Sequence, residues 1–115
     1  MVDLSTAREM AMSLPGTVEM DHFGIPSFRV NKRIFSTLWI HDNKMMVKLS
    51  LIDQSVFTAF DKSVIYPVPN EYGKYGSMGY TLFELATVRP EMLQDALQTA
   101  YQDIIAKTTK KKKRS

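Results

Sequence analysis

Hydrophobic residues near both ends of the chain recur every three or four positions, which is the spacing of an amphipathic helix. The first such segment covers residues 3–14 and stops at Pro15-Gly16. The second opens at Pro90, a residue favoured in the first turn of a helix, and keeps its apolar side as far as Ile104. We therefore expect one helix near each end of the chain.

Between these two helices the sequence contains six short segments rich in β-branched and aromatic residues. They are Thr17–Phe23, Ser27–Val30, Arg33–His41, Lys44–Leu49, Val64–Val68 and Tyr80–Val88. Two or three residues join each of the first four to the next, and such short connections favour antiparallel strands, because a parallel crossover needs about a dozen residues. The segments therefore predict an antiparallel sheet.

A third helix is expected between the fourth and fifth strands. Ser50 begins the sequence S-L-I-D, a capping box in which Asp53 replaces the more usual Glu or Gln. The apolar residues expected to form the buried side of this helix are Leu51, Ile52, Val56, Phe57 and Phe60. The resulting order, αββββαββα, predicts an α+β fold with a single antiparallel β-sheet and helices packed on one face.

Length and composition fit a single domain, which we place at residues 1–109. The chain has 115 residues, of which 44% are apolar and 23% charged, as is usual for a globular protein. The last residues differ, because five consecutive positive charges, Lys110, Lys111, Lys112, Lys113 and Arg114, have no apolar residue among them. Like charges repel one another, so the sequence predicts a disordered basic tail at residues 110–115.

Several classes of protein are disfavoured by what the sequence lacks. It has no cysteine, which excludes disulfides, thiol chemistry and cysteine-ligated metals and favours a reducing compartment. No apolar run approaches the roughly 20 residues that cross a bilayer, and the opening MVDLSTAREM does not have the pattern of a signal peptide. We therefore expect a cytoplasmic protein with no membrane role.

Candidate catalytic and metal-binding groups are sparse. The two histidines, His22 and His41, have no partner at the spacing of metal ligands, so ordinary histidines at strand ends are the simpler interpretation. No nucleophile stands beside an evident base. The sequence therefore favours binding over catalysis and indicates no metal and no cofactor.

Positive charge gathers in the middle of the folded part. The tail holds five of the 15 Lys+Arg, so residues 1–109 have 10 against 12 Asp+Glu, a net charge of −2. Within that part residues 22–74 are net +3, whereas residues 1–21 are net −3 and residues 75–109 net −2. The predicted sheet region is thus positive and the predicted helices are negative, which favours an anionic partner for the sheet.

The sequence resembles the MmcQ/YjbR family over about residues 4–105. The pieces that carry the resemblance are L-P-G-T at residues 14–17, D-H-F-G at 21–24, P-S-F-R-V at 26–30 and M-V-K-L-S at 46–50. The resemblance implies a frataxin-like (CyaY-like) fold, with a curved antiparallel sheet, and DNA binding through a double-wing arrangement of hairpins. The chain departs from the family pattern at Gly73–Tyr80, where a glycine-lysine loop leading into Gly-Trp is expected, so the role of this loop stays open.

The two-residue period of a strand divides Arg33–His41 between two faces of the sheet. Ile34, Leu38 and Ile40 fall on the face expected beneath the helices, while Phe35 and Trp39 fall on the open face. Aromatic rings on such a face can stack on bases while cations neutralise phosphates. The candidate nucleic-acid-binding residues are Arg29, Arg33, Phe35, Trp39, Lys44, Lys48, Lys74, Lys110, Lys111, Lys112, Lys113 and Arg114.

Two functions remain open on the sequence. One is weak and largely sequence-independent DNA binding through the sheet face, the hairpin wings and the basic tail. The alternative is a protein-interaction domain that uses the same aromatic face and has no nucleic-acid role. A purely structural interpretation also exists for the aromatic residues Phe35 and Trp39, which can form cross-strand pairs. Likewise, Gly73-Lys74 can be part of a flexible hairpin connection.

Overall fold

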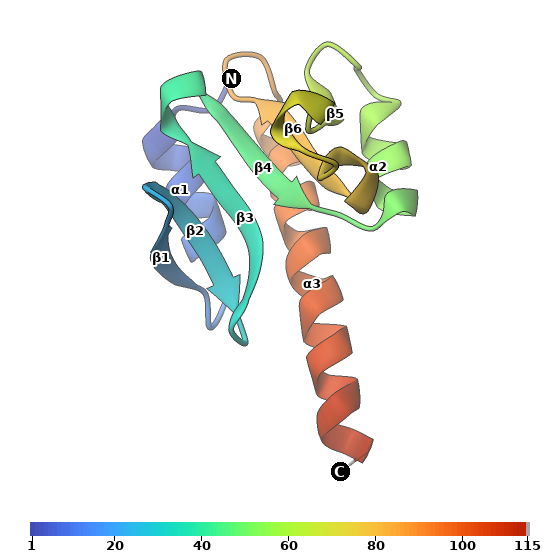
Figure 1. The fold of residues 1–115 in the computed structure, drawn as a ribbon. Coiled ribbons are helices and arrows are strands. Elements are labelled where there is room, and N and C mark those ends of the chain that lie inside the picture. The colour runs from blue at the N-terminus through green and yellow to red at the C-terminus, as the bar shows by residue number, and fades with distance from the viewer. Residues whose placement is uncertain (115) are drawn as a thin grey trace.

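Six strands form one antiparallel sheet in the order β1-β2-β3-β4-β6-β5 (Figure 1). The strands are β1 (Val18–His22), β2 (Ile25–Val30), β3 (Arg33–Trp39), β4 (Lys44–Lys48), β5 (Ile65–Pro67) and β6 (Tyr80–Glu84). A computed structural model of the protein describes the backbone of residues 1–114 and the side chains of residues 1–109. Two-residue turns join β1 to β2 and β2 to β3, which makes these neighbours antiparallel, as predicted.

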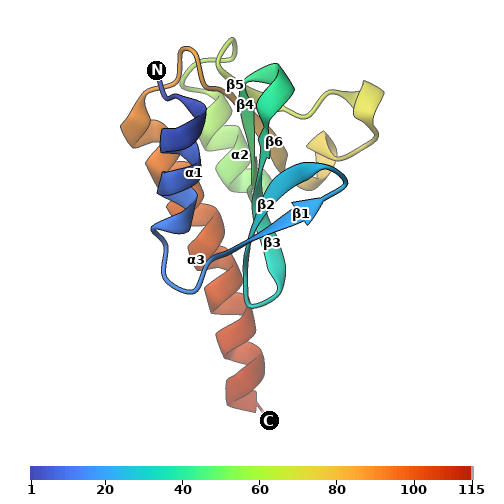
Figure 2. The same cartoon turned by 90° about the vertical axis from the view of Figure 1, so that its left-hand side faces the viewer.

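Three α-helices cover one face of the sheet. They are α1 (Leu4–Met12), α2 (Leu51–Thr58) and α3 (Pro90–Arg114), and all three lie on the same side when the sheet is seen nearly edge-on (Figure 2). Two 3-10 turns, η2 (Asn70–Tyr72) and η3 (Gly76–Met78), lie on the other side. The predicted α+β class, the order αββββαββα and the one-sided helices are confirmed.

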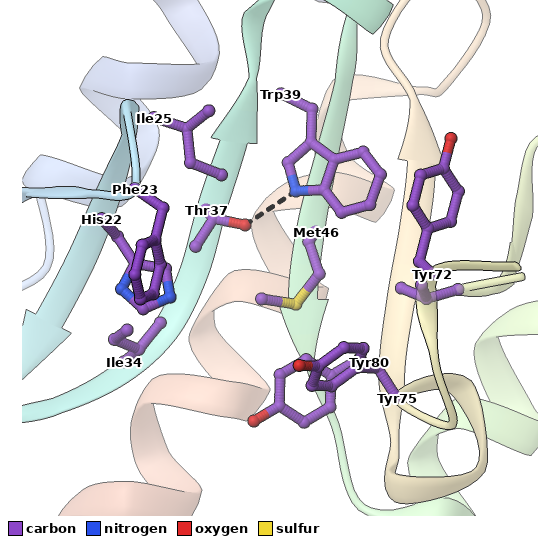
Figure 3. A pocket seen from close by; sticks show the side chains of 11 residues that line it. His22, Phe23, Ile25, Ile34, Thr37, Trp39, Met46, Tyr72, Tyr75 and Tyr80 are labelled. Carbon is purple, nitrogen blue, oxygen red and sulfur yellow. Dashed lines mark hydrogen bonds between the residues drawn. The ribbon is translucent and has the colours of Figure 1, made fainter. Parts of the chain in front are cut away.

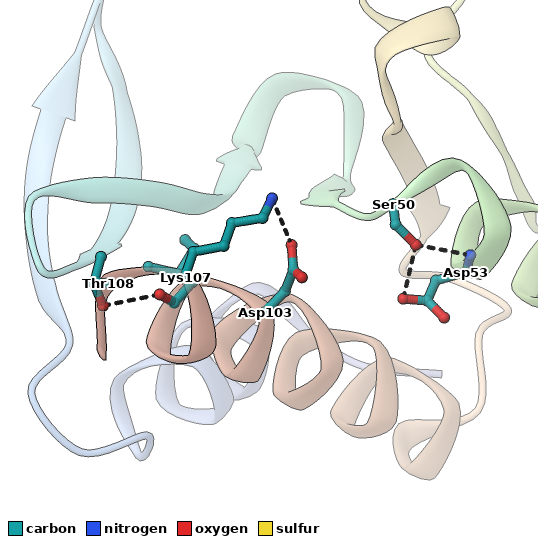
Figure 4. Close-up of polar contacts among 6 residues, drawn as sticks. Ser50, Asp53, Asp103, Lys107 and Thr108 are labelled. Carbon is teal, nitrogen blue, oxygen red and sulfur yellow. Dashed lines mark hydrogen bonds and ion pairs between the residues drawn. The ribbon is translucent and has the colours of Figure 1, made fainter. Parts of the chain in front are cut away.

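Side-chain hydrogen bonds cap the first turns of α1 and α2, and at α2 they confirm the predicted capping box. The Asp3 carboxylate accepts a hydrogen bond from the backbone N–H of Thr6 at 2.7 Å in α1. At α2 the Ser50 hydroxyl accepts from the backbone N–H of Asp53 at 3.1 Å and donates to the Asp53 carboxylate at 3.0 Å (Figure 4). The bonds from the N–H groups of Thr6 and Asp53 satisfy amides that the first turn of a helix leaves without partners.

The main core lies between the sheet and the helices. Phe28 and Phe83 from the sheet belong to one buried cluster with Leu93 and Leu97 of α3. From α1 the cluster includes Ala7 and Ala11, which have no exposed surface. Their small side chains let the helix lie close to its neighbours.

A β-bulge in β3 overturns the predicted division of its faces. The register passes from Phe28 opposite Ser36 to Arg29 opposite Ile34, so Phe35 has no partner on β2. One extra residue reverses the facing of every side chain on one side of it. Phe35 is therefore fully buried in the main core, while Ile34 lies on the open face. The prediction was wrong for both residues.

β3 and β6 end two and four residues before their predicted ends. β3 ends at Trp39, because the next residues form the 3-10 turn η1 (Ile40–Asp42) and Asn43 takes a left-handed conformation with φ 54°. β6 ends at Glu84, whose carbonyl accepts a hydrogen bond from the backbone N–H of Val88 at 2.9 Å in a turn. The predicted ends of these strands therefore belong to turns.

α2 buries less of its apolar surface than predicted. Within this helix Phe57 and Gln54 are the buried residues. The other predicted core residues are exposed over half or more of their surface: Leu51, Ile52, Val56 and Phe60. The prediction was wrong for these four residues because α2 packs against β5, the edge strand, where little of the core lies beneath it.

α3 runs beyond the end of the sheet to Arg114 (Figure 1). On the described part of this extension, Lys107 Nζ lies 3.1 Å from the carboxylate of Asp103 (Figure 4). The side chains of residues 110–115 lie outside the described part, so the predicted disordered basic tail stays a prediction. Within residues 1–114, none of the helices has the length and apolar character needed to cross a membrane.

Candidate functional site

The open face of the sheet carries a second, smaller apolar cluster. Cross-strand partners share a face, and the register places Met46 opposite Thr37 on one side and Leu82 on the other. Met46 and Leu82 are buried here, with Trp39 and Tyr80 packed against them. Aromatic rings therefore cover the face that the helices leave open.

A cleft of about 430 Å³ opens above this cluster. Its lining residues come from β1, the β1–β2 turn, β2, β3, β4, β6 and the connection between β5 and β6: His22, Phe23, Ile25, Ile34, Thr37, Trp39, Met46, Val68, Tyr72, Tyr75 and Tyr80. Figure 3 shows Met46 between two groups of these side chains, with His22 and Phe23 on one side and the tyrosines on the other. The size and the mostly apolar lining are typical of a site for a small organic group.

The first wall of the cleft is the tip of the β1–β2 hairpin, formed by His22, Phe23 and Ile25. Phe23 and Gly24 are the two turn residues, and both have positive φ, 54° and 89°. Positive φ at both positions defines the type I′ turn, which matches the natural twist of two paired strands. The turn directs Phe23 to the cleft, where its ring meets His22 edge-on with centroids 4.7 Å apart.

The second wall, which we call the tyrosine wall, consists of Tyr72, Tyr75 and Tyr80. Tyr75 and Tyr80 pack with ring centroids 5.4 Å apart, and Tyr72 meets Trp39 edge to face, also at 5.4 Å. Among the described residues no hydrogen bond occupies the hydroxyl groups of these three tyrosines, whereas the hydroxyl of Tyr101 donates to the backbone at Pro15. The three hydroxyls can therefore bond to a ligand.

Hydrogen bonds from α2 and from the end of β4 hold the tyrosine wall in place. The buried Gln54 side chain donates to the backbone carbonyl of Gly76 at 2.9 Å and to the hydroxyl of Thr81 at 3.1 Å. The backbone N–H of Leu49 donates to the carbonyl of Gly79 at 2.9 Å. These contacts fix the loop at both ends of η3, so the wall belongs to the folded scaffold.

The floor of the cleft presents a fixed tryptophan. Trp39 Nε1 donates a hydrogen bond to the hydroxyl of Thr37 at 3.0 Å, two residues earlier on the same face of β3 (Figure 3). This bond satisfies the polar atom of the indole and fixes the plane of the ring. The indole can therefore act as a stacking surface that needs little reordering when a ligand binds.

Two lysines lie on the open face, each close to a tyrosine ring. Lys44 Nζ is 5.4 Å from the centre of the Tyr66 ring and 3.5 Å from the Glu84 carboxylate. Hydrogen bonding to the Tyr66 oxygen, with help from the charge of Glu84, raises the pKa of Lys44 above its ordinary value. Lys44 is therefore firmly charged, but its charge is largely balanced by Glu84.

Lys48 lies beside the tyrosine wall. Its Nζ is 5.4 Å from the centre of the Tyr80 ring, and within residues 1–109 no carboxylate oxygen comes within 4.0 Å of it. Burial lowers the pKa of Lys48, and the positive charge of Lys107 lowers it further. A negatively charged group beside the cleft would raise the pKa of Lys48 again, so this side chain is suited to pair with a phosphate.

Comparison with known sequences identifies the family. The sequence model of the YjbR family matches residues 12–103. The chain belongs to the YjbR family. A comparison with curated proteins gives no match.

A solved structure shares the architecture of this chain. The crystal structure of Deinococcus radiodurans protein DR2400, described as a DUF419 domain, matches with a TM-score of 0.73 over 88% of this chain and 77% of that chain. The two sequences are 18% identical, so the likeness shows the shared fold alone. The predicted family is confirmed, whereas the implied likeness to frataxin stays a prediction.

The YjbR domain brings only some of the predicted binding residues to the cleft face. Arg29, Trp39, Lys44 and Lys48 lie on it, Arg29 opposite Ile34 with its Nε donating to the hydroxyl of Ser27 at 3.1 Å. Lys74 is exposed in the connection between η2 and η3, next to the tyrosine wall. The described side chains do not include Lys110, Lys111, Lys112, Lys113 and Arg114.

Two predicted residues lie away from this face. Phe35 is in the main core of the YjbR domain, against Tyr101 of α3. Arg33 pairs with the buried core residue Val30, so it lies on the helix side of the sheet. Their placement on the open face was wrong, because the bulge at Phe35 reverses the facing of the residues before it.

Most of the residues that line the cleft were not predicted from the sequence. The strand pattern includes Phe23 in a strand, because Phe-Gly lacks the Asn or Asp that usually marks a two-residue hairpin. The tyrosine wall has a clearer signal, since three tyrosines occur within the nine residues Tyr72–Tyr80 of a glycine-rich loop. Within the described part of the YjbR domain no group of three His, Asp or Glu side chains could hold a metal ion.

Proposed function

We propose that this YjbR protein binds DNA weakly and largely without sequence preference, and that it takes unpaired bases into the aromatic cleft. The observation that carries the proposal is the cleft itself, in which Trp39 and the tyrosine wall surround Met46. Every base has a flat π-face, so stacking on aromatic side chains tolerates any sequence and contributes about 1–3 kcal/mol per base.

The cleft favours single strands over a duplex. Bases in a duplex are stacked on their neighbours, so their faces are not available to Trp39 or Tyr80. A cleft of about 430 Å³ between two walls has room for a base that leaves the stack. Lys48, beside Tyr80, would then neutralise a backbone phosphate.

The affinity is expected to be low. Residues 1–109 have a net charge of −2, and Lys44 is balanced by Glu84 at 3.5 Å. Strong binders of nucleic acid usually present a broad positive surface, and a net negative charge on the domain makes such a surface unfavourable. Stacking supplies most of the affinity of the cleft, and the basic residues 110–114 add a charge-dependent part.

Fluorescence offers a direct test, because Trp39 is the single tryptophan of the chain. Titration with oligo-dT at low salt should quench the emission of Trp39, and an equal amount of duplex DNA should quench it less. Trp39→Ala, measured with a labelled oligonucleotide, should weaken binding by roughly 1–3 kcal/mol and leave the salt dependence nearly unchanged. Trp39→Phe is the matched control that keeps a stacking ring.

A protein-interaction domain is the second candidate, and one observation favours it. Among the described residues that line the cleft, His22 is the only titratable one other than the tyrosines, so the cleft would also accept an aromatic or aliphatic side chain of a partner protein. Salt separates the two functions, because phosphate contacts lose affinity steeply as salt rises and an apolar interface does not. No quenching by oligo-dT at low salt would reject the DNA proposal and leave this one.

A further inference from the structure

Phe23 stands at the tip of the β1–β2 hairpin with almost no support from the rest of the fold. Its side chain is 94% exposed, although it belongs to the lining of the cleft. The neighbouring Gly24 has no heavy atom within 4 Å of the position where a Cβ would lie. The hairpin tip therefore has free space around it, and burial of Phe23 contributes little to folding.

The backbone conformation at position 23 is unfavourable for a phenylalanine. Its φ of 54° lies in the left-handed region, which bulky side chains avoid and which Asn and Gly accept. The β2–β3 hairpin has the same kind of turn and places Asn31, with φ 51°, at the corresponding position. A phenylalanine in this position is thus both strained and exposed, and strain of this kind at a cleft indicates a functional role.

We infer that Phe23 is a ligand-contacting residue that closes on a base held in the cleft. This inference rests on the proposed DNA binding and assigns the hairpin tip a part in it. A base stacked on Trp39 or on the tyrosine wall would present its other face toward the hairpin, where the Phe23 ring stands. Ring contact from both sides would bury the base and also bury the exposed ring of Phe23.

The test compares stability with binding in one variant. Phe23→Asn places the residue that suits the turn, so the melting temperature should stay equal or rise. Affinity for oligo-dT should nevertheless fall by about 5-fold to 150-fold, which corresponds to the loss of one stacked base, with the salt dependence unchanged. Phe23→Trp should keep the affinity, because the larger ring also stacks.

Phe60→Asn is the matched control, since Phe60 is another exposed phenylalanine but lies just after α2 and outside the cleft. It should leave oligo-dT binding unchanged. If Phe23→Asn binds as tightly as the wild type while Trp39→Ala loses affinity, the role of Phe23 is rejected and the DNA proposal stands. If the wild type does not bind oligo-dT at low salt, both proposals are rejected.

Discussion

The ring of Phe35 meets the ring of Tyr101 edge to face, with centroids 5.9 Å apart and an angle of 79° between their planes. This contact joins β3 to α3 in the main core, and it exists because the bulge turns Phe35 toward the helices. Edge-to-face pairs of buried rings add stability beyond the area they bury. The contact therefore links the irregular register of β3 to the stability of the domain.

Phe35→Ala should lower the free energy of unfolding by about 3–5 kcal/mol, the usual effect of removing a fully buried phenylalanine. Chemical denaturation of both proteins would measure the difference. Phe60→Ala is the control, because that ring is mostly exposed and its removal should change stability by about 0.5 kcal/mol or less. Equal small effects for both variants would show that Phe35 faces solvent, as the simple strand period predicts.

Gln54→Leu should destabilise the protein by about 1–3 kcal/mol, because it leaves the carbonyl of Gly76 and the hydroxyl of Thr81 without their donor. Binding of oligo-dT should weaken as well, since the bond from Gln54 holds the tyrosine wall. Gln98→Leu, at an exposed position of α3, should change neither property. Full affinity in a stable Gln54→Leu protein would mean that the wall keeps its position without this bond.

Gly79→Ala should be more harmful than Gly24→Ala, although both glycines have positive φ, 99° and 89°. A Cβ at Gly79 would lie 1.8 Å from the carbonyl oxygen of Leu49, so the chain must move, whereas Gly24 has open space around it. We expect a loss of about 1 kcal/mol at Gly24 and more than about 2 kcal/mol at Gly79. Thermal melts of the two variants would compare them, and similar losses would contradict the close approach at Gly79.

The Asp3 cap gives the protein a contribution to stability that depends on pH. The hydrogen bond from Thr6 N–H lowers the pKa of Asp3 below its ordinary value of 3.8. The charged carboxylate is therefore the form that folding favours, and its contribution is complete above pH 3.8 and is lost as pH falls through the lower folded-state pKa. Asp3→Ala should lower the melting temperature at neutral pH, and the difference from wild type should shrink in acid.

Asp3→Asn separates the charge from the cap, because asparagine also accepts the Thr6 hydrogen bond and does not titrate. Its melting temperature relative to Asp3→Ala should not change with pH. A wild-type advantage over Asp3→Ala that stays constant down to the lowest pH would contradict the lowered pKa of Asp3.

Deletion of residues 110–115 should weaken DNA binding and reduce its salt dependence. The slope of log affinity against log salt should flatten by about 0.9 for each phosphate of duplex DNA that the shortened protein no longer neutralises. Quenching of Trp39 by oligo-dT at saturation should persist in the shortened protein, since the cleft is unchanged. An unaltered salt slope would show that these five charges do not bind phosphate.

The order of the elements and the kind of sheet they form follow from the sequence alone. Asp3 and Ser50 mark helix starts because their side chains bond to amides three residues ahead, which is a local interaction. Connections of two residues leave adjacent strands no arrangement except an antiparallel one. Both effects act over a few residues, so they can be predicted from the chain without knowledge of the rest of the fold.

Which residues face the cleft depends on the three-dimensional arrangement of the whole chain. Strand periodicity assumes an unbroken ladder, and the single unpaired Phe35 reverses the facing of Arg33 and Ile34. The tyrosine wall is held against the sheet through a bond from Gln54 to Gly76, 22 residues apart in sequence. The residues that form the candidate site are therefore set by register and by long-range hydrogen bonds, which local sequence patterns do not encode.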